Sequence, residues 1–255
     1  MKKHLFLLLL LGVAIALPAE NIFTEKIFRG HLQGLVADTS GIYCAFAYEM
    51  AKFDFNGKVI CRTPAPFHSG DITACGKKFY CSVTLHDAAL IKKYGARSCL
   101  FVYDRNLKLL EVIPLKQLAA IDGIAYLNGK FYVALNEHGS ERHMENRIAI
   151  LDKNFKVLKI ATVSINRLTR YGVQTLNPFR GKLLGGFYGG GGNSFVFDPD
   201  QLANSDTTVC PIDSIPANTS VGFSECQPPS PQRAPLSSPA TPVQKIPFPN
   251  GGNTV

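Results

Sequence analysis

Residues 122–134 read Asp-Gly-Ile-Ala-Tyr-Leu-Asn-Gly-Lys-Phe-Tyr-Val-Ala, and they contain the clearest structural signal in the chain. An apolar stretch precedes Asn128-Gly129, and an aromatic, β-branched stretch follows it. Asn-Gly is typical of a tight turn between two antiparallel strands. The stretch therefore predicts two strands joined by a turn at residues 128–130.

The same pattern recurs along the chain. Each copy opens with Gly or Asp and an apolar residue, passes through a turn into an aromatic strand, and continues through a loop to an apolar strand that ends in aspartate. These aspartates are Asp54, Asp104, Asp152 and Asp198, which lie 50, 48 and 46 residues apart. This period predicts four-stranded blades at residues 31–65, 68–116, 120–166 and 169–212.

The predicted fold is therefore all-β, a β-propeller with four clear blades and a partial fifth. One small twisted sheet cannot bury both faces, whereas a ring of sheets buries each face against a neighbour. We expect the four aspartates to accept backbone hydrogen bonds in the turns that follow them. Residues 209–212 are expected to be the closing strand of the fourth blade.

The pattern changes near the C-terminus. Gly222 lies 50 residues after Gly172, so Val221-Gly222-Phe223 is expected to open a fifth blade. Residues 227–255 are rich in Pro and Ser and are predicted to be disordered. We divide the chain into a signal peptide (1–19), a propeller domain (20–226) and this tail. Two interpretations remain: a shortened member of a longer propeller family, or a closed four-bladed ring with a tail.

The first residues predict export. Lys2 and Lys3 precede an apolar run from Leu5 to Leu17, and a small-residue site ends at Ala19. This combination is typical of a secretory signal peptide. A run of about 13 residues is short of the roughly 20 that span a bilayer, so no integral membrane anchor is expected. The protein is predicted to be periplasmic or secreted.

Charge and cysteine content narrow the function classes. Cleavage removes Lys2 and Lys3 and lowers the formal charge from +8 to +6. The basic residues are scattered and Trp is absent, which argues against a nucleic-acid partner. The seven cysteines include no CxxC pair, and an odd number leaves at least one unpaired within the chain. Cys44 and Cys81 are interpreted as buried strand residues in preference to a disulfide.

The quoted stretch resembles the propellers grouped with gluconolactonase, SMP-30 and NHL-repeat proteins. The resemblance implies a six-bladed propeller and, for the lactonases, a metal-dependent hydrolase. Asp122 matches a metal ligand of that family, so a divalent cation such as calcium is an expectation that the resemblance carries. The family also supplies a glutamate at the start of its first inner strand, where this chain has the neutral Gln33.

The predicted blades sort polar residues onto one face. Loops that join strand 2 to strand 3, and strand 4 to the next blade, share that face and are the longer ones, as is common for binding loops. Histidines and carboxylates together can bind a ligand or a divalent ion, or exchange protons. The predicted ligand-binding residues are His68, Asp71, Asp122, Glu137, His138, His143, Arg170 and Tyr171.

Each of these residues has a structural alternative. Polar side chains at inner-strand starts can bond the neighbouring blade's backbone, and residues 136–147 can be a solvated loop. The sequence favours an exported propeller that binds a small molecule, glycan or protein partner on this face, with no chemistry assigned. The alternative is a metal-dependent hydrolase of the SMP-30/gluconolactonase kind, so whether the protein is an enzyme stays open.

Overall fold

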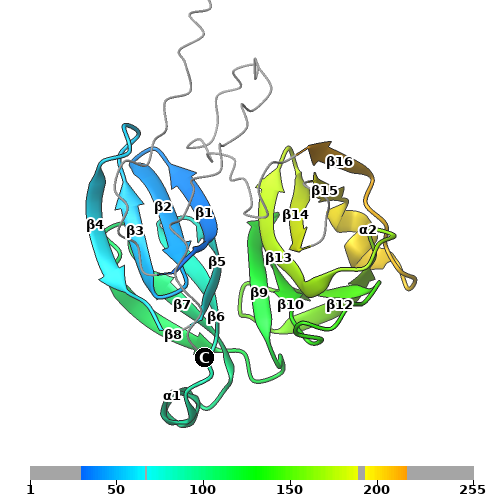
Figure 1. Cartoon of the computed structure of the whole chain (residues 1–255), viewed down its shortest axis with the longest axis horizontal. Helices are drawn as coiled ribbons and strands as arrows, with labels where there is room; N and C mark the ends of the chain where they lie inside the picture. The colour runs from blue at the N-terminus through cyan, green and yellow to red at the C-terminus, as the bar shows by residue number, and fades with distance from the viewer. Residues whose placement is uncertain (1–29, 67, 189–192, 217–255) are drawn as a thin grey trace, which may run out of the picture.

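The computed structural model describes residues 30–66, 68–188 and 193–216. They form four separate four-stranded antiparallel sheets, each following the chain from its innermost to its outermost strand (Figure 1). This arrangement confirms the predicted all-β propeller. The predicted signal peptide, fifth-blade start and C-terminal tail lie outside the described residues.

The sheets match the predicted blades closely, and we number the blades in chain order. Blade 1 contains β1 (Leu32–Asp38), β2 (Gly41–Phe46), β3 (Glu49–Phe53) and β4 (Val59–Pro64). Blade 2 contains β5 (Ser69–Cys75), β6 (Lys78–Thr84), β7 (Ser98–Tyr103) and β8 (Leu109–Pro114). Blade 3 contains β9 (Ile121–Leu127), β10 (Lys130–Leu135), β11 (Asn146–Leu151) and β12 (Val157–Val163). Blade 4 contains β13 (Arg170–Phe179), β14 (Lys182–Tyr188), β15 (Asn193–Phe197) and β16 (Asp213–Pro216).

Two short helices interrupt the strand pattern. Helix α1 (Ala88–Tyr94) lies in the long loop of blade 2, and Asp87 caps its N-terminus. Helix α2 (Pro199–Asn204) follows Asp198 and takes the place of the tight turn found in the other blades. The predicted closing strand at residues 209–212 is therefore wrong, because α2 lengthens the connection and the outer strand forms at Asp213–Pro216. Val209 instead bridges to Val163 of blade 3 and is buried.

Apolar layers join consecutive blades. One buried cluster spans blades 1 and 2, around Tyr43, Ile72 and Phe101. A second spans blades 2 and 3, and a third spans blades 3 and 4. The outermost strands alternate between exposed and partly buried residues, as in β4. Each central strand is therefore buried on both faces, which explains why its sequence is nearly continuous in apolar residues.

The repeat aspartates act as predicted. In the turns of blades 1, 2 and 3, the Oδ1 atoms of Asp54, Asp104 and Asp152 each accept hydrogen bonds from the backbone N–H groups two and four residues further on, at 2.8–2.9 Å. Asp198 accepts from the backbone of Asp200 at 2.9 Å and so caps α2. These side chains stabilise the connection that follows each third strand, and one of them occurs in each blade.

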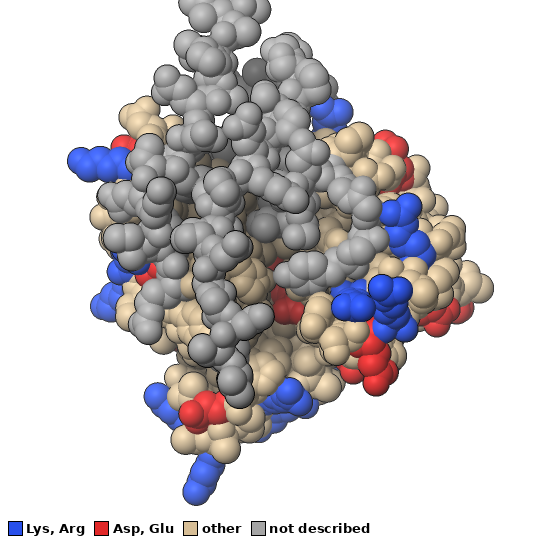
Figure 2. Space-filling view, in the orientation of Figure 1, with Lys and Arg blue, Asp and Glu red and all other residues tan. Residues whose placement is uncertain are grey.

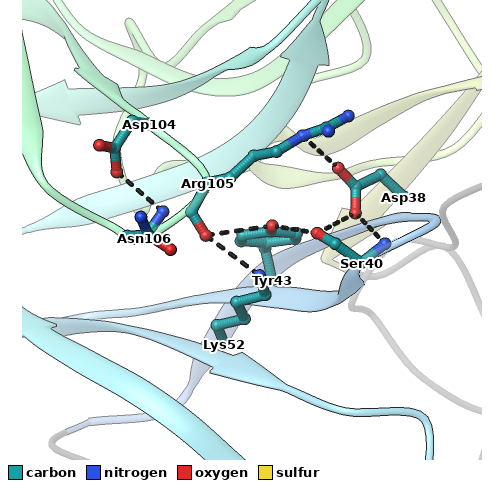
Figure 3. Close-up of polar contacts among 7 residues, drawn as sticks. All are labelled: Asp38, Ser40, Tyr43, Lys52, Asp104, Arg105 and Asn106. Atoms are coloured by element: carbon teal, nitrogen blue, oxygen red, sulfur yellow. Dashed lines mark hydrogen bonds and ion pairs between the residues drawn. The ribbon is translucent and has the colours of Figure 1, made fainter.

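A polar network fixes blade 1 to blade 2 on the face with the short turns (Figure 3). The carbonyl oxygen of Arg105 accepts hydrogen bonds from Tyr43 Oη and Lys52 Nζ, both at 3.2 Å. The Arg105 guanidinium pairs with Asp38 at 3.0 Å, and the Tyr43 ring stacks on Phe79 with centroids 3.9 Å apart. Because these contacts run from one blade to the other, we interpret this network as an inter-blade lock.

The junction between blades 1 and 4 differs from the other three. Inner strands β1 and β13 face each other across the upper part of Figure 1, and their contact is much smaller than those of β1 with β5, β5 with β9 and β9 with β13. No apolar cluster among the described residues joins these two blades. The ring formed by the described residues is therefore open at this point.

The described cysteines are all free, and Cys44 and Cys81 are fully buried strand residues, as predicted. Within the described ranges we find no helix of sufficient length and apolarity to span a bilayer. Figure 2 shows basic side chains spread around the periphery of the visible face and mixed with acidic ones, without a large patch of a single charge.

Candidate functional site

The inner strands begin with the same irregularity. Each of β1, β5, β9 and β13 shows a register shift against its neighbouring strand within its first six residues. Such bulges re-aim side chains and are frequent beside functional sites. By register, the residues at the equivalent position in the four inner strands are Gln33, Gly70, Asp122 and Gln174.

Asp71 follows Gly70 in β5, and its side chain lies at the centre of the ring, next to the position shared by Gln33, Gly70, Asp122 and Gln174. Its carboxylate accepts backbone hydrogen bonds from Ile72 at 2.8 Å, Ile124 at 3.2 Å and Leu176 at 2.7 Å. Burial raises the pKa of Asp71 well above its ordinary value, and the three amide donors act in the opposite direction. The innermost strand of a propeller has an unpaired edge, so Asp71 satisfies the edges of three blades at once.

Glycine makes room for this carboxylate. A Cβ atom at Gly34 would lie 2.0 Å from Asp71 Oδ1 and 2.8 Å from the Asp71 Cα, so any side chain there would collide. Asp71 is 0% exposed. The structure therefore places Asp71 below the site, in a position to tie the blades together and out of reach of a ligand.

Asp122 lies above Asp71 at the start of β9. Its Oδ2 accepts hydrogen bonds from Asn136 Nδ2 at 2.8 Å and Gln174 Nε2 at 3.0 Å. Burial raises the pKa of Asp122 to about 7, although these two donors lower it. A carboxyl group with this pKa exchanges its proton near neutral pH, which suits both hydrogen bonding and general acid–base chemistry. We call Asp122, Asn136 and Gln174 the axial cluster.

The axial cluster contains one unsatisfied acceptor. The Oδ1 atom of Asn136 is buried and has no hydrogen-bond partner in the structure. A buried acceptor without a donor costs about 1–3 kcal/mol, so such groups in native proteins call for an explanation. Because the other end of the same amide donates to Asp122, the orientation of Asn136 Oδ1 is fixed.

Tyr171 lies next to the axial cluster. Its carbonyl oxygen accepts from Gln174 Nε2 at 2.6 Å, and its backbone N–H donates to Gly139 at 2.7 Å. Tyr171 has a φ of 59°, a left-handed conformation that is unusual for a bulky residue and is found at strained functional positions. Its side chain is 38% exposed. Tyr171 therefore combines a fixed backbone with an accessible ring at the site.

The predicted histidine forms a second group at the start of blades 1 and 2. His68 Nε2 lies 2.7 Å from Gln33 Nε2, and the rings of His31 and His68 are 5.9 Å apart. Burial lowers the pKa of His68, and His31 and His86 lower it further. Burial also lowers the pKa of His31. These two histidines are therefore neutral at pH 7 and above, and they offer hydrogen bonds without charge.

The remaining predicted residues lie on a separate loop or at its anchor. Glu137 pairs with Arg147, and the rings of His138 and His143 are 4.3 Å apart. His143 bridges to Thr169, which holds the loop against the start of β13. Arg170 is exposed at the first position of β13. The structure brings together Asp122 and Tyr171, but it keeps Glu137 in an ion pair outside the axial cluster.

The site does not fit the divalent cation that the resemblance implies. The described ranges contain no group of three or more His, Cys, Asp or Glu side chains positioned to hold a metal ion. Asp122 is surrounded by amide N–H donors, whose partial positive charge points at the carboxylate oxygen. Hard cations prefer several oxygen ligands, whereas amide hydrogens repel them.

Sequence reasoning overlooked Asn136 and Gln174, which are uncharged. Gln174 occupies the repeat position of Asp122, and this equivalence was available from the spacing of Ile124 and Leu176. Asn136 follows the aromatic strand of blade 3 and resembles any loop residue in the sequence. The polar groups around Asp122 are therefore mostly carboxamides, which sequence motifs rarely include.

Comparisons with known proteins establish the fold. No model of a protein family matches the chain, and no curated protein resembles it in sequence. Glutaminyl cyclase of Myxococcus xanthus is similar in structure, with a TM-score of 0.55 and 12% identity over 74% of this chain and 71% of that one. The WD40 domain of Neurospora crassa Pan2 aligns at a TM-score of 0.43 and 10% identity, over 74% and 50% of the two chains. The likeness to the cyclase, at 12% identity, is one of fold, and the chain is a β-propeller.

Proposed function

We propose that this protein is an exported binding protein whose axial cluster takes a neutral, hydrogen-bonding group of a small molecule or glycan. The observation that carries the proposal is the buried, partnerless Asn136 Oδ1 beside a carboxyl group whose pKa is about 7. A ligand hydroxyl or N–H group donates to Asn136 Oδ1, and protonated Asp122 offers a donor in return.

The lack of fixed charge at the site determines the ligand class. At pH 7, His31 and His68 are neutral and Asp122 is only partly ionised. Gln33, Asn136 and Gln174 contribute carboxamides. Phosphates and carboxylates are usually bound by Arg, Lys or helix N-termini, and the axial cluster contains none of these. A sugar hydroxyl or an amide fits better than an anion.

Calorimetric titration with a panel of neutral sugars, N-acetylated sugars and small primary amides tests this proposal. We expect at least one member to bind, and we expect Asn136→Leu to weaken it about tenfold or more, because one fixed acceptor is lost. Asn154→Leu, in an exposed turn on the opposite face, is the matched control and should bind as the parent does. Equal weakening by both variants, or binding of phosphorylated sugars alone, contradicts the proposal.

The second candidate function is a metal-dependent hydrolase of the lactonase kind. Its support is the match of Asp122 to a metal ligand of that family. Adding calcium chloride and a simple lactone to the same panel separates the two functions. The binding proposal predicts that chelation leaves ligand affinity unchanged. Calcium-dependent lactone hydrolysis that is lost in Asp122→Asn would instead favour the hydrolase.

Export is part of the proposal and rests on the basic, apolar and small-residue pattern of residues 1–19. Expression of the full chain in a bacterium with a general secretion pathway is expected to give a mature protein that begins at Glu20. Intact-mass measurement of the periplasmic or secreted fraction checks this. A mass that retains residues 1–19, found only in the cytoplasm, would contradict it.

A further inference from the structure

The closed junction between blades 2 and 3 uses two positions on the inner strand of blade 2. Asp71 and Thr73 of β5 both point toward blade 3. Asp71 Oδ2 accepts from the backbone of Ile124 at 3.2 Å, and Thr73 Oγ1 accepts from the backbone of Tyr126 at 3.0 Å. Side chains at these two positions therefore satisfy the free edge of the inner strand that follows.

The equivalent residues of blade 4 are also buried, but among the described residues no further inner strand follows for their side chains to contact. By register they are Thr175 and Asn177 of β13, which are 1% and 2% exposed. Thr175 Oγ1 and Asn177 Nδ2 have no hydrogen-bond partner in the structure. Two buried polar atoms on the same side of one strand, each unfavourable if left unpaired, indicate that a further strand edge belongs there.

Apolar residues on both walls of the opening lead to the same conclusion. Leu184 and Val196 of blade 4 occupy the register positions of Tyr80 and Val102, which join the apolar cluster between blades 2 and 3. Leu184 and Val196 are buried, yet neither belongs to a cluster among the described residues. On blade 1, Cys44 is fully buried on the face turned away from blade 2.

We propose that residues 221–227 form a fifth inner strand in the opening between blade 4 and blade 1. Connections from an outer strand to the next inner strand span residues 65–68, 115–120 and 164–169. Strand β16 ends at Pro216, so residues 217–220 give a connection before Val221 that is as long as residues 65–68. Gly222-Phe223 then repeats the Gly-apolar pairs Gly34-Leu35 and Gly123-Ile124.

The register of the other blades fixes the contacts of this strand. Phe223 takes the position of Ile124, so its backbone N–H donates to Thr175 Oγ1 and its side chain packs on Leu184. Glu225 takes the position of Tyr126, so its backbone carbonyl oxygen accepts from Asn177 Nδ2. Gly222 provides the close approach to the axis that Gly34 and Gly123 provide elsewhere. The occupant is thus a segment of the same chain rather than a second copy.

Thiol protection tests the placement in the full-length protein. Cys44 and Cys81 occupy the same register position in blades 1 and 2, and both are fully buried, but blade 1 covers Cys81. We expect Phe223→Pro to raise the rate of Cys44 alkylation by iodoacetamide at least tenfold relative to Cys81, because proline removes the N–H and disrupts the strand. Phe248→Pro is the matched control and should leave the ratio unchanged.

An unchanged ratio in Phe223→Pro overturns the proposal. Protection of Cys44 that is lost on dilution also overturns it, because a second copy of the chain would then be the occupant. If Phe223→Pro exposes Cys81 as well, Phe223→Ala provides the comparison at a smaller perturbation, and a selective rise at Cys44 is again the expected result.

A double-mutant cycle tests whether Thr175→Val lowers or raises the stability of the protein. If Thr175 Oγ1 accepts the Phe223 N–H, Thr175→Val destabilises the protein in the parent background but is neutral or stabilising with Phe223→Pro, which lacks that N–H. If the hydroxyl is unpaired, Thr175→Val stabilises the protein equally in both backgrounds, because a buried unpaired group is removed. The second pattern would refute the proposed strand.

Discussion

Asp71→Ala is expected to lower the free energy of unfolding by about 3–5 kcal/mol, a large share of the stability of a domain. The substitution leaves the backbone N–H groups of Ile72, Ile124 and Leu176 without their acceptor, and all three lie at the buried axis. It also removes the side chain around which Gly34 is fitted. Denaturant unfolding followed by fluorescence of the tyrosines measures the loss.

The matched control is Asp54→Ala. Asp54 also accepts two backbone hydrogen bonds, but its turn is exposed and water replaces the lost acceptor. We expect a cost of about 1 kcal/mol there. If Asp71→Ala costs no more than Asp54→Ala, Asp71 does not tie the blades together.

Asp122→Asn is expected to change how stability depends on pH. The folded-state pKa of Asp122 is about 7, whereas the ordinary value is 3.8. Between these values the folded protein binds more protons than the unfolded chain, so stability falls as pH rises from about 4 to about 7 and then levels off. Asparagine keeps an acceptor for Asn136 and Gln174 but carries no charge, so this loss is removed.

The variant should therefore match the parent near pH 4 and exceed it at pH 8, by on the order of 3 kcal/mol. Asp71 contributes in the same direction in both proteins, and because the Asp122 charge also raises the pKa of Asp71, the difference between the two curves reports Asp122 together with its effect on Asp71. Thermal unfolding midpoints from pH 4 to pH 8 measure it. Parallel curves for the two proteins would show that Asp122 titrates in its ordinary range.

The sequence predicts the blades well because their determinants are local. Asp54, Asp104 and Asp152 each bond their own turn, and each Asn-Gly or Gly-Lys turn sets the register of one hairpin. The closing strand of blade 4 was predicted at the wrong residues because α2 replaces a turn. An aspartate precedes this helix just as an aspartate precedes each turn in the other blades. A capping aspartate does not by itself distinguish a turn from a short helix.

The site is less predictable because its contacts are long-range. Asp71 and Asp122 look alike in the sequence, since each starts an inner strand beside a glycine. Only the packing of three blades shows that Asp71 is enclosed by amide groups while Asp122 lies among carboxamides. The partnerless oxygen of Asn136 is a feature of burial, and no motif records it.

The side-chain amide signals of Asn136 and Gln174 in a nitrogen-15 NMR spectrum test the central claim most directly. Both amides donate to Asp122, so a ligand that bonds Asn136 Oδ1 must shift them. We predict that a neutral sugar or primary amide from the panel shifts these two signals in a saturable way while the side-chain signal of Asn154 stays in place. A panel member that binds the protein but leaves Asn136 and Gln174 unchanged would contradict the account.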